Sequence, residues 1–441
     1  MKQYTLRRRI DLNDFYDIII VGGGPAGCAA AIAAARDGSK VLLVEATGTL
    51  GGMGTAGMVP AWCYFSDGEK IIYRGIAEKI FTEARKGVPH EAENAMAWVD
   101  INLEQLKLVY DRFVKQSGAD VLFFTRLAGV EMSSKSEVDS LILASKQGLT
   151  AYKAKVYIDC TGDGDLAAWA GAIYEIGDRN HTMQSATHCF SLAGVDMFQY
   201  TMGVRLHGDN TESPIYEILK SGKYPLIEDN HLCQNPVGPG VVQFNAGHIN
   251  VNTLDDKQLS DAMIRGREMA NQYKEALQAY HSKAFGHAFV NNTAQLLGVR
   301  EGRRILGDYV LTLDDFKARR QFPDEIGRNS YYVDIHIPGS ESVHYGKGES
   351  HGIPYRILTP KGFKNLLVAG RCASSDHLVY GSIRVMTNCL VMGEAAGTAA
   401  NIFMHGPRDV HEIDVRQLRG RLREAGQYLS LIHISEPTRP Y

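Results

Sequence analysis

The apolar residues near the start of the chain follow the pattern of a strand–helix–strand unit. Residues 17–21 form an apolar, mostly β-branched run, which is typical of a strand buried on both faces. An alanine-rich stretch continues to Asp37, and Gly38 stands where a helix would end. A second apolar run, residues 40–44, ends at Glu45. These segments predict the βαβ unit of a parallel sheet.

Later segments add both helices and strands to this picture. No run of about 18 apolar residues occurs, so no membrane span is expected. Apolar residues recur with helical or alternating spacing in several places. Helices are predicted at residues 103–116, 261–280 and 392–400, and strands at 119–124, 127–132, 156–159 and 183–193.

The turn between the first strand and helix contains the pattern G-x-G-x-x-G. Gly22 allows a tight turn, Gly24 lets backbone N–H groups approach a pyrophosphate, and Gly27 lets the helix lie close to the strand. The phosphates would meet the positive end of the helix dipole, next to Pro25 and Ala26. Glu45, about twenty residues on and followed by Ala46, is placed to accept hydrogen bonds from an adenosine ribose. The unit predicts a Rossmann-type dinucleotide site without separating NAD from FAD.

Three later stretches resemble the FAD-dependent oxidoreductase family that is related to the fumarate reductase and succinate dehydrogenase flavoproteins. The resemblance extends from Phe15 to Leu429. The residues that carry it are Gly51-Gly52-Met53-Gly54-Thr55, Thr161-Gly162-Asp163, Gly370-Arg371, Ser382-Ile383 and Val385-Met386.

This resemblance implies that FAD is the cofactor and that these stretches contact it. The loop at residues 51–55 would run along the pyrophosphate, and residues 161–163 would return to it near the adenosine. A helix beginning near Val385 would direct its dipole at the N1/O2 edge of the flavin, where negative charge collects on reduction. Leu127 would contact the adenine through its backbone. Gly302 replaces a polar residue usual in the family, which puts a substrate contact there in doubt.

Flavin motifs near both ends of the chain indicate one domain built from two separated segments. We expect an α/β, Rossmann-like FAD-binding domain, a parallel sheet with helices on both faces, at residues 1–170 and 352–428. An inserted α+β substrate or cap domain is expected at 171–351, with the chemistry at the junction. Residues 429–441 match, up to Arg439, the translation of a common transposase sequencing adapter, and we expect them to be a non-native tail.

Charge and cysteine usage narrow the function classes. The 441 residues carry a formal net charge of −3, so nucleic acid is not expected as the main ligand. The basic run at residues 7–9 is followed by acidic rather than apolar residues, which does not fit a secretory signal, and we expect a cytoplasmic protein. The seven cysteines form no C-x-x-C pair, and His281 and His287 lack metal-ligand spacing. No metal site is therefore predicted.

Four residues are candidates for the chemistry beside the flavin. His377 is expected in the loop between two flavin-contact stretches, and histidine is a frequent general acid or base, although a structural or surface role is an equal alternative. Arg300 and Arg384 would hold an anionic or polyhydroxy substrate or stabilise reduced flavin, or else form structural ion pairs. For Tyr380, and for His188 in the insertion, a core role is the more frequent alternative.

These observations predict a FAD-dependent oxidoreductase that transfers hydride between the flavin and a small polar metabolite. The sequence has no C-x-x-x-x-C pair and no second strand, G-x-G-x-x-G turn and helix unit for NAD(P)H, so the electron donor or acceptor is unspecified. The alternative is a flavin-dependent RNA-modifying protein or a scaffold that only holds FAD. An RNA-modifying protein would need a basic face, of which the charge balance gives no sign.

Overall fold

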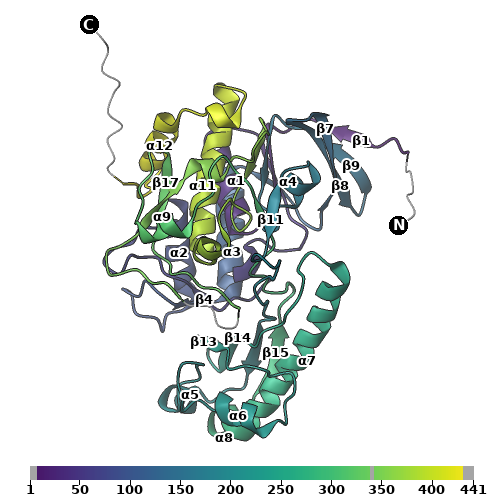
Figure 1. Ribbon diagram of the computed structural model, residues 1–441. Coiled ribbons are helices and arrows are strands. Elements are labelled where there is room, and N and C mark those ends of the chain that lie inside the picture. The colour runs from purple at the N-terminus through teal and green to yellow at the C-terminus, as the bar shows by residue number, and fades with distance from the viewer. Residues whose placement is uncertain (1–6, 338–341, 431–441) are drawn as a thin grey trace.

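The structure, a computed structural model, describes residues 7–337 and 342–430 (Figure 1). Its centre is a parallel five-stranded sheet in which every neighbouring pair runs in the same direction. The inner strands are buried on both faces, as continuous apolar runs predict, and the α/β fold class is confirmed. In spatial order the strands are β19 (Leu366–Val368), β10 (Val156–Asp159), β2 (Ile18–Val21), β3 (Val41–Val44) and β6 (Asp120–Leu122).

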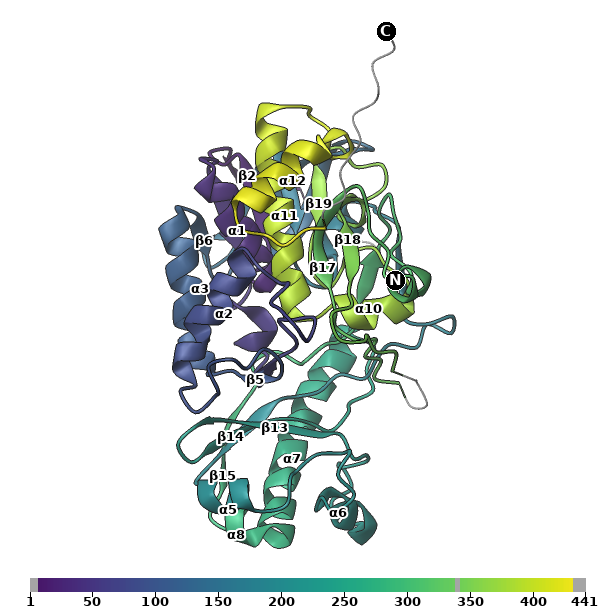
Figure 2. The same cartoon turned by 90° about the vertical axis from the view of Figure 1, so that its left-hand side faces the viewer.

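Two helices rich in small residues, α1 (Pro25–Arg36) and α11 (Met386–His405), lie side by side against one face of this sheet (Figures 1 and 2). A Cβ atom at Gly393 would lie 2.1 Å from the carbonyl oxygen of Ala26, and one at Gly397 would lie 2.2 Å from that of Ala30. The helix predicted at residues 392–400 is therefore the middle of a longer helix, and its glycines let the two backbones touch. Helices α2 (Ile76–Ala84) and α3 (Leu103–Ser117) complete this layer.

A second sheet covers the opposite face of the central sheet, so the helices expected on both faces form a full layer on one face only. Its order is β1-β9-β8-β7, with β1 parallel to β9 and the other pairs antiparallel. Val138, Leu141 and Leu143 of β8 share a hydrophobic core with residues of β2 and β3. The strands are β1 (Asp11–Asn13), β7 (Arg126–Ser134), β8 (Glu137–Ser145) and β9 (Gly148–Tyr152).

A separate lobe lies below these layers in both views (Figures 1 and 2). It has its own hydrophobic core, between an antiparallel sheet of order β13-β14-β12-β15 and the long helix α7 (Asp256–Tyr280). Helix α7 starts earlier than predicted because Asp255 caps it by accepting a hydrogen bond from the Gln258 N–H. The remaining elements are β12 (Phe190–Ala193), α5 (Met197–Met202), α6 (Ile215–Ser221), β13 (Leu232–Gly238), β14 (Val241–Ala246), α8 (Ser282–Phe285) and β15 (Phe289–Thr293).

The hydrophobic core of the lower lobe spans fewer residues than the insertion expected at 171–351. Its buried members run from Ala186 to Leu297, whereas Leu311, Ile326 and Val333 belong to the core of the upper layers. We therefore propose narrower bounds for the inserted unit than residues 171–351. Residues in the first part of the predicted strand at 183–193 form only isolated bridges, with Ile249 and Gly298.

Short elements join the two lobes or close the upper one. Within the described ranges, no helix combines the length and apolar character needed to cross a membrane. Leu429 and Ser430, the first residues of the expected tail, are buried, and the rest of that tail lies outside the described residues. The short elements are β4 (Ala61–Trp62), β5 (Val99–Asp100), α4 (Asp165–Trp169), β11 (Tyr174–Ile176), β16 (Arg303–Ile305), α9 (Leu313–Lys317), β17 (Glu325–Asn329), β18 (His351–Pro354), α10 (His377–Ile383) and α12 (Val415–Glu424).

Candidate active site

Four of the predicted cofactor segments follow four adjacent strands of the central sheet. Gly22 follows β2, Glu45 follows β3, Thr161 comes two residues after β10, and Gly370 comes two residues after β19. Because the strands are parallel, these segments all lie at the carboxyl edge of the sheet. This is the edge at which ligands bind in open α/β sheets.

The glycine turn fits the close approach of a phosphate. Gly22 has φ +100°, and a Cβ there would lie 2.3 Å from the carbonyl oxygen of Cys160. A Cβ at Gly27 would lie 1.8 Å from the carbonyl oxygen of Gly22, so the helix can approach the turn only through glycine. A Cβ at Gly24 would meet no atom within 4 Å. Gly24 is the N-cap of α1 and offers no side-chain cap, which leaves the first N–H groups of the helix to a ligand or solvent.

Glu45 lies beside this turn with both carboxylate oxygens engaged. Oε2 accepts a hydrogen bond from the Gly23 N–H and Oε1 from the Thr47 N–H, each at 2.7 Å. A carboxylate has about four acceptor positions, so Glu45 can still accept from a ribose hydroxyl. Ala46 next to it is exposed. Leu127 lies in a different sheet, as the second residue of β7.

The loop at residues 51–55 lies directly on the glycine turn. The Gly51 N–H donates to the Gly23 carbonyl oxygen at 2.8 Å, and a Cβ at Gly52 would lie 3.0 Å from the Gly24 Cα. Gly54 faces the start of α11, since a Cβ there would lie 3.0 Å from the Met386 sulfur. The Thr55 hydroxyl donates to Leu50, and Met53 packs against the core.

An ion pair joins the segments that follow β10 and β19. Arg371 contacts Asp163 with 2.7 Å between nitrogen and oxygen, and Gly162, at φ +81°, gives the guanidinium room. A Cβ at Gly302 would lie 1.9 Å from an oxygen of Asp163. Gly302 thus leaves room for the Asp163 carboxylate in its ion pair with Arg371, and its expected effect on a substrate contact stays a prediction.

The connection from α10 to α11 places a second uncapped helix start near the loop at residues 51–55. Val385 is the N-cap of α11, as predicted, and it offers no side-chain cap. The Thr387 hydroxyl is buried without a partner among the described residues. The Ser382 hydroxyl, which was expected to contact the cofactor, has two partners within the protein. It accepts a hydrogen bond from the Asn329 amide at 2.6 Å and donates one to the Tyr331 carbonyl oxygen. Ile383, next to it, is buried in the core.

His377 and Tyr380 belong to one polar group on α10. His377 is the first residue of this helix rather than a loop residue, because Asp376 caps the helix with its side chain. Nδ1 of His377 lies 3.1 Å from a carboxylate oxygen of Glu301, which also pairs with Arg304. The ring of Tyr380 lies under the Arg304 guanidinium, and its hydroxyl is buried without a partner among the described residues. His188 is instead buried in the lower lobe, with Nε2 2.9 Å from the Ala294 carbonyl oxygen, which fits a core role.

Arg300 and Arg384 meet where the two lobes join. Arg300 donates to the Ser185 carbonyl oxygen and the Thr187 hydroxyl, both at 2.8 Å, but no carboxylate of the described residues lies within 4.0 Å of it. Burial, and then the nearby charge of Arg384, lower the pKa of Arg300 to about 10. Arg300 is therefore a buried cation at neutral pH, and its charge is not matched by a direct ion pair. Arg384 pairs with Asp334 at 3.2 Å.

Three histidines that the sequence did not single out lie in the same place. They are His231 before β13, His248 after β14 and His336 in the connection between β17 and β18. Burial, and then the charge of Arg300, lower the pKa of His231 and bring that of His336 to about 4. Burial opposes charge on Asp334, but His336, Arg384 and Arg300 hold the pKa of this carboxyl well below its ordinary value. Sequence spacing could not reveal the group, because only the fold brings it together.

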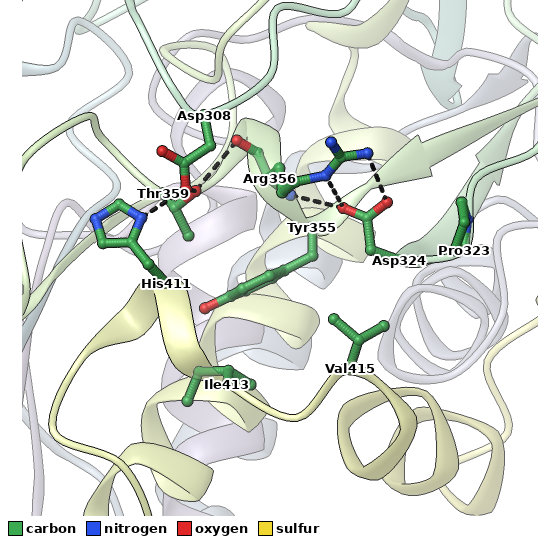
Figure 3. A pocket seen from close by; sticks show the side chains of 9 residues that line it. All are labelled: Asp308, Pro323, Asp324, Tyr355, Arg356, Thr359, His411, Ile413 and Val415. Atoms are coloured by element: carbon green, nitrogen blue, oxygen red, sulfur yellow. Dashed lines mark hydrogen bonds and ion pairs between the residues drawn. The ribbon is translucent and has the colours of Figure 1, made fainter. Parts of the chain in front are cut away.

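A hollow of about 370 Å³ elsewhere in the upper lobe has a different character (Figure 3). Its polar side chains are paired with one another: Arg356 with Asp324 at 2.9 Å, and His411 with Asp308 at 2.5 Å. None of the predicted cofactor or catalytic residues lines it. The hollow therefore presents no unmatched group to a ligand.

Comparison with known proteins gives a family match over most of the chain. A family model described as FAD dependent oxidoreductase matches residues 17–422. The mitochondrial dihydrolipoyl dehydrogenase of Schizosaccharomyces pombe is 31% identical over 158 residues, which are 34% of this chain and 29% of that protein. The glutathione reductase of the same organism is 30% identical over 116 residues, 24% of this chain and 23% of that protein. The matches thus span less than a third of either relative.

A solved structure of a geranylgeranyl bacteriochlorophyll reductase-like protein from Thermoplasma acidophilum also resembles the chain. The alignment covers 96% of this chain and 94% of that chain. The sequence identity is 16% and the TM-score is 0.48.

Proposed function

The chain belongs to the family of FAD dependent oxidoreductases, and from this premise we propose that it oxidises or reduces a small anionic metabolite where its two lobes meet. FAD supplies the hydride chemistry when bound, and the chain supplies binding, orientation and proton transfer. The observation that carries the proposal is the buried Arg300, which has no carboxylate partner among the described residues and lies beside Arg384.

We assign the carboxyl edge of the central sheet to FAD. The glycine turn and the start of α1 would hold the pyrophosphate, and Glu45 the ribose. The open space at Gly24 supports this assignment, since the neighbouring Gly22 and Gly27 are tightly packed and Gly24 is not. The start of α11, uncapped at Val385, would face the flavin end of the cofactor.

The substrate would lie against Arg300 and Arg384. A guanidinium matches a carboxylate or phosphate through paired hydrogen bonds, and a buried one gains most from an anion. The Ser185 and Thr187 contacts fix the Arg300 guanidinium in place before a substrate arrives. Because Arg384 is the C-cap residue of α10 and Val385 the N-cap of α11, Arg384 is adjacent in sequence to the proposed flavin-facing helix start.

His377 would exchange the proton that accompanies hydride transfer. A carboxylate only accepts hydrogen bonds, so the contact with Glu301 indicates that Nδ1 of His377 carries the hydrogen. Nε2 then presents a lone pair and can act as a general base. The Arg304–Glu301 ion pair fixes the carboxylate that orients the ring.

The test is anaerobic reduction of the bound flavin by a panel of carboxylate and phosphate metabolites, each compared with its uncharged ester or alcohol. We expect bleaching of the visible absorption, or reoxidation of chemically reduced protein, by an anionic compound and not by its neutral analogue. Equal reaction with both members of each pair would contradict the role of Arg300. A flavin that responds to neither would contradict the proposed activity.

Variants separate substrate binding from cofactor binding. Arg300→Gln should lower the apparent affinity for the active anion by about 10- to 100-fold or more, since one charge-assisted contact is worth about 1.5–3 kcal/mol. Arg320→Gln is the control, because Arg320 pairs with Asp315 in a half-exposed position and faces no proposed ligand. Both proteins should bind FAD like the unchanged chain.

A further inference from the structure

The three histidines at the junction of the lobes each bring one ring nitrogen close to the other two. One nitrogen from each of His231, His248 and His336 can be chosen so that all lie within 4.8 Å of one another. Nε2 of His248 lies 2.9 Å from Nδ1 of His336. Two ligand nitrogens at about 2.0–2.1 Å from a tetrahedral zinc ion are roughly 3.3 Å apart. The pair is therefore within about 0.5 Å of a coordinating separation.

Two of these histidines are supported from behind by carboxylates. Nδ1 of His248 lies 2.8 Å from an oxygen of Asp229, and Nε2 of His336 lies 3.2 Å from an oxygen of Asp334. In each case the nitrogen that faces the carboxylate is the one that does not face the other histidine. This carboxylate–histidine arrangement is typical of metal ligands, because it fixes the tautomer and the orientation of the ring.

The third histidine is held less tightly. The ring of His231 lies almost parallel to that of His248, with ring centroids 4.2 Å apart and 18° between the planes. A metal ion prefers to lie in the plane of each ring, so His231 has to turn when it coordinates. Its Nδ1 is buried and has no partner among the described residues, so the turn breaks no hydrogen bond at that atom. An unpartnered buried nitrogen gains free energy when it meets a ligand.

The local charges are compatible with a divalent ion. Asp229 and Asp334 contribute two negative charges directly behind the ligands. Arg300 and Arg384 contribute two positive charges. The four charged side chains around the neutral histidines therefore sum to zero. A bound cation would then favour an anion or hydroxide as its fourth ligand, on the side of the two arginines.

We propose that His231, His248 and His336 bind a divalent first-row transition metal ion of the Zn²⁺ class. Imidazole nitrogen is a preferred ligand of Zn²⁺, and three protein ligands with one open position are typical of a catalytic rather than a structural zinc site. The open position would take water or an oxygen of an anion. The proposal does not depend on the identity of the substrate, and it would hold if the proposed oxidoreductase activity proved wrong.

Metal binding is tested on the FAD-bound protein. The protein is first stripped with a strong chelator, and Zn²⁺ or Co²⁺ is then added and the bound metal measured after dialysis. We expect one metal ion per chain, and Co²⁺ should show visible bands at longer wavelengths than the flavin absorption. A stripped protein that retains no metal above background, and gives no Co²⁺ bands, would overturn the proposal without recourse to any variant.

Variants then locate the site. His231→Ala, His248→Ala and His336→Ala should each abolish the Co²⁺ bands, whereas His287→Ala, which changes an exposed histidine of the same lobe, should leave them unchanged. Asp229→Asn should weaken Zn²⁺ binding by about 10- to 100-fold while leaving all three ligands in place. Retained flavin absorption and an unchanged melting temperature show that each variant is folded. Metal that binds equally to the three alanine variants would lie elsewhere and would overturn the assignment.

Discussion

Two glycines three residues apart, Gly24 at the N-cap of α1 and Gly27 in its first turn, should respond to alanine in opposite ways. In Gly24→Ala the new methyl group meets no atom within 4 Å, and Gly24 has φ −71°, which alanine adopts readily. The stability of the cofactor-free protein should therefore change by less than about 1 kcal/mol, and a small gain is expected from the reduced freedom of the unfolded chain. In Gly27→Ala the methyl group would lie 1.8 Å from the Gly22 carbonyl oxygen, so α1 has to move away from the sheet. We expect a loss of about 3 kcal/mol or more, because backbone rather than a flexible side chain is displaced.

FAD affinity, unlike stability, should be sensitive to alanine at Gly24. If the space at Gly24 receives the pyrophosphate, the methyl group of Gly24→Ala excludes it, and FAD affinity should fall at least tenfold although the protein is fully folded. Titration of deflavinated protein with FAD measures the affinity, and urea unfolding of the same preparations measures the stability. Gly420→Ala is the control, because a methyl group in the middle of α12 also meets nothing within 4 Å and should add about 1 kcal/mol of stability without changing FAD binding. Unchanged FAD affinity in Gly24→Ala would refute the assignment of this turn to the pyrophosphate.

Three further substitutions test the surroundings of the cofactor edge. Burial raises the pKa of Asp159 from its ordinary 3.8 to about 6. The stability gained by protonating Asp159 is therefore complete below about pH 4 and is lost as the pH rises through 6. In urea unfolding, the stability of the unchanged chain should rise relative to that of Asp159→Asn on acidification, by up to about 3 kcal/mol. Arg371→Met leaves Asp163 unpaired and should cost about 3 kcal/mol in the same assay, with weaker FAD retention on gel filtration. Gly397→Ala, 2.2 Å from the Ala30 carbonyl oxygen, should cost about 1–3 kcal/mol without a specific effect on FAD affinity, and a stable variant would contradict the close contact of α1 and α11.

Local patterns were sufficient to predict the first βαβ unit of the sheet. The strand–glycine–helix–strand order around Gly22 is continuous in sequence, and each part constrains the next through backbone geometry. The run of small residues at 392–400 predicted the middle of α11, where Gly393 and Gly397 touch α1, whereas the helix start near Val385 was expected only from the resemblance to the family. Features that depend on contacts between neighbours in sequence are therefore visible in the chain itself.

The junction of the lobes could not be predicted in this way. His231, His248 and His336 are separated by long stretches of chain, and only the closure of the β13–β14 hairpin and the path of the chain after β17 bring them together. The capping of α10 by Asp376, which turns His377 from a loop residue into a helix residue, is likewise visible only once the helix has formed. Tertiary contacts, rather than local propensity, determine these positions.

The same junction connects the two hydrophobic cores through a few polar contacts. Asp334 and Arg384 come from segments that pack in the upper core, whereas His248 and Arg300 belong to the lower lobe. The His248–His336 hydrogen bond therefore crosses between the lobes, and an anion or a metal ion at this point would be held from both sides. Because the cofactor edge lies entirely in the upper lobe, changes in the β13–β14 hairpin should alter the affinity for a ligand at the junction while leaving the FAD site intact. The lower lobe would thus select what reacts with the flavin, while its contacts with the Ala56 carbonyl oxygen, from the Gln295 and Leu296 N–H groups, support one side of the proposed FAD site.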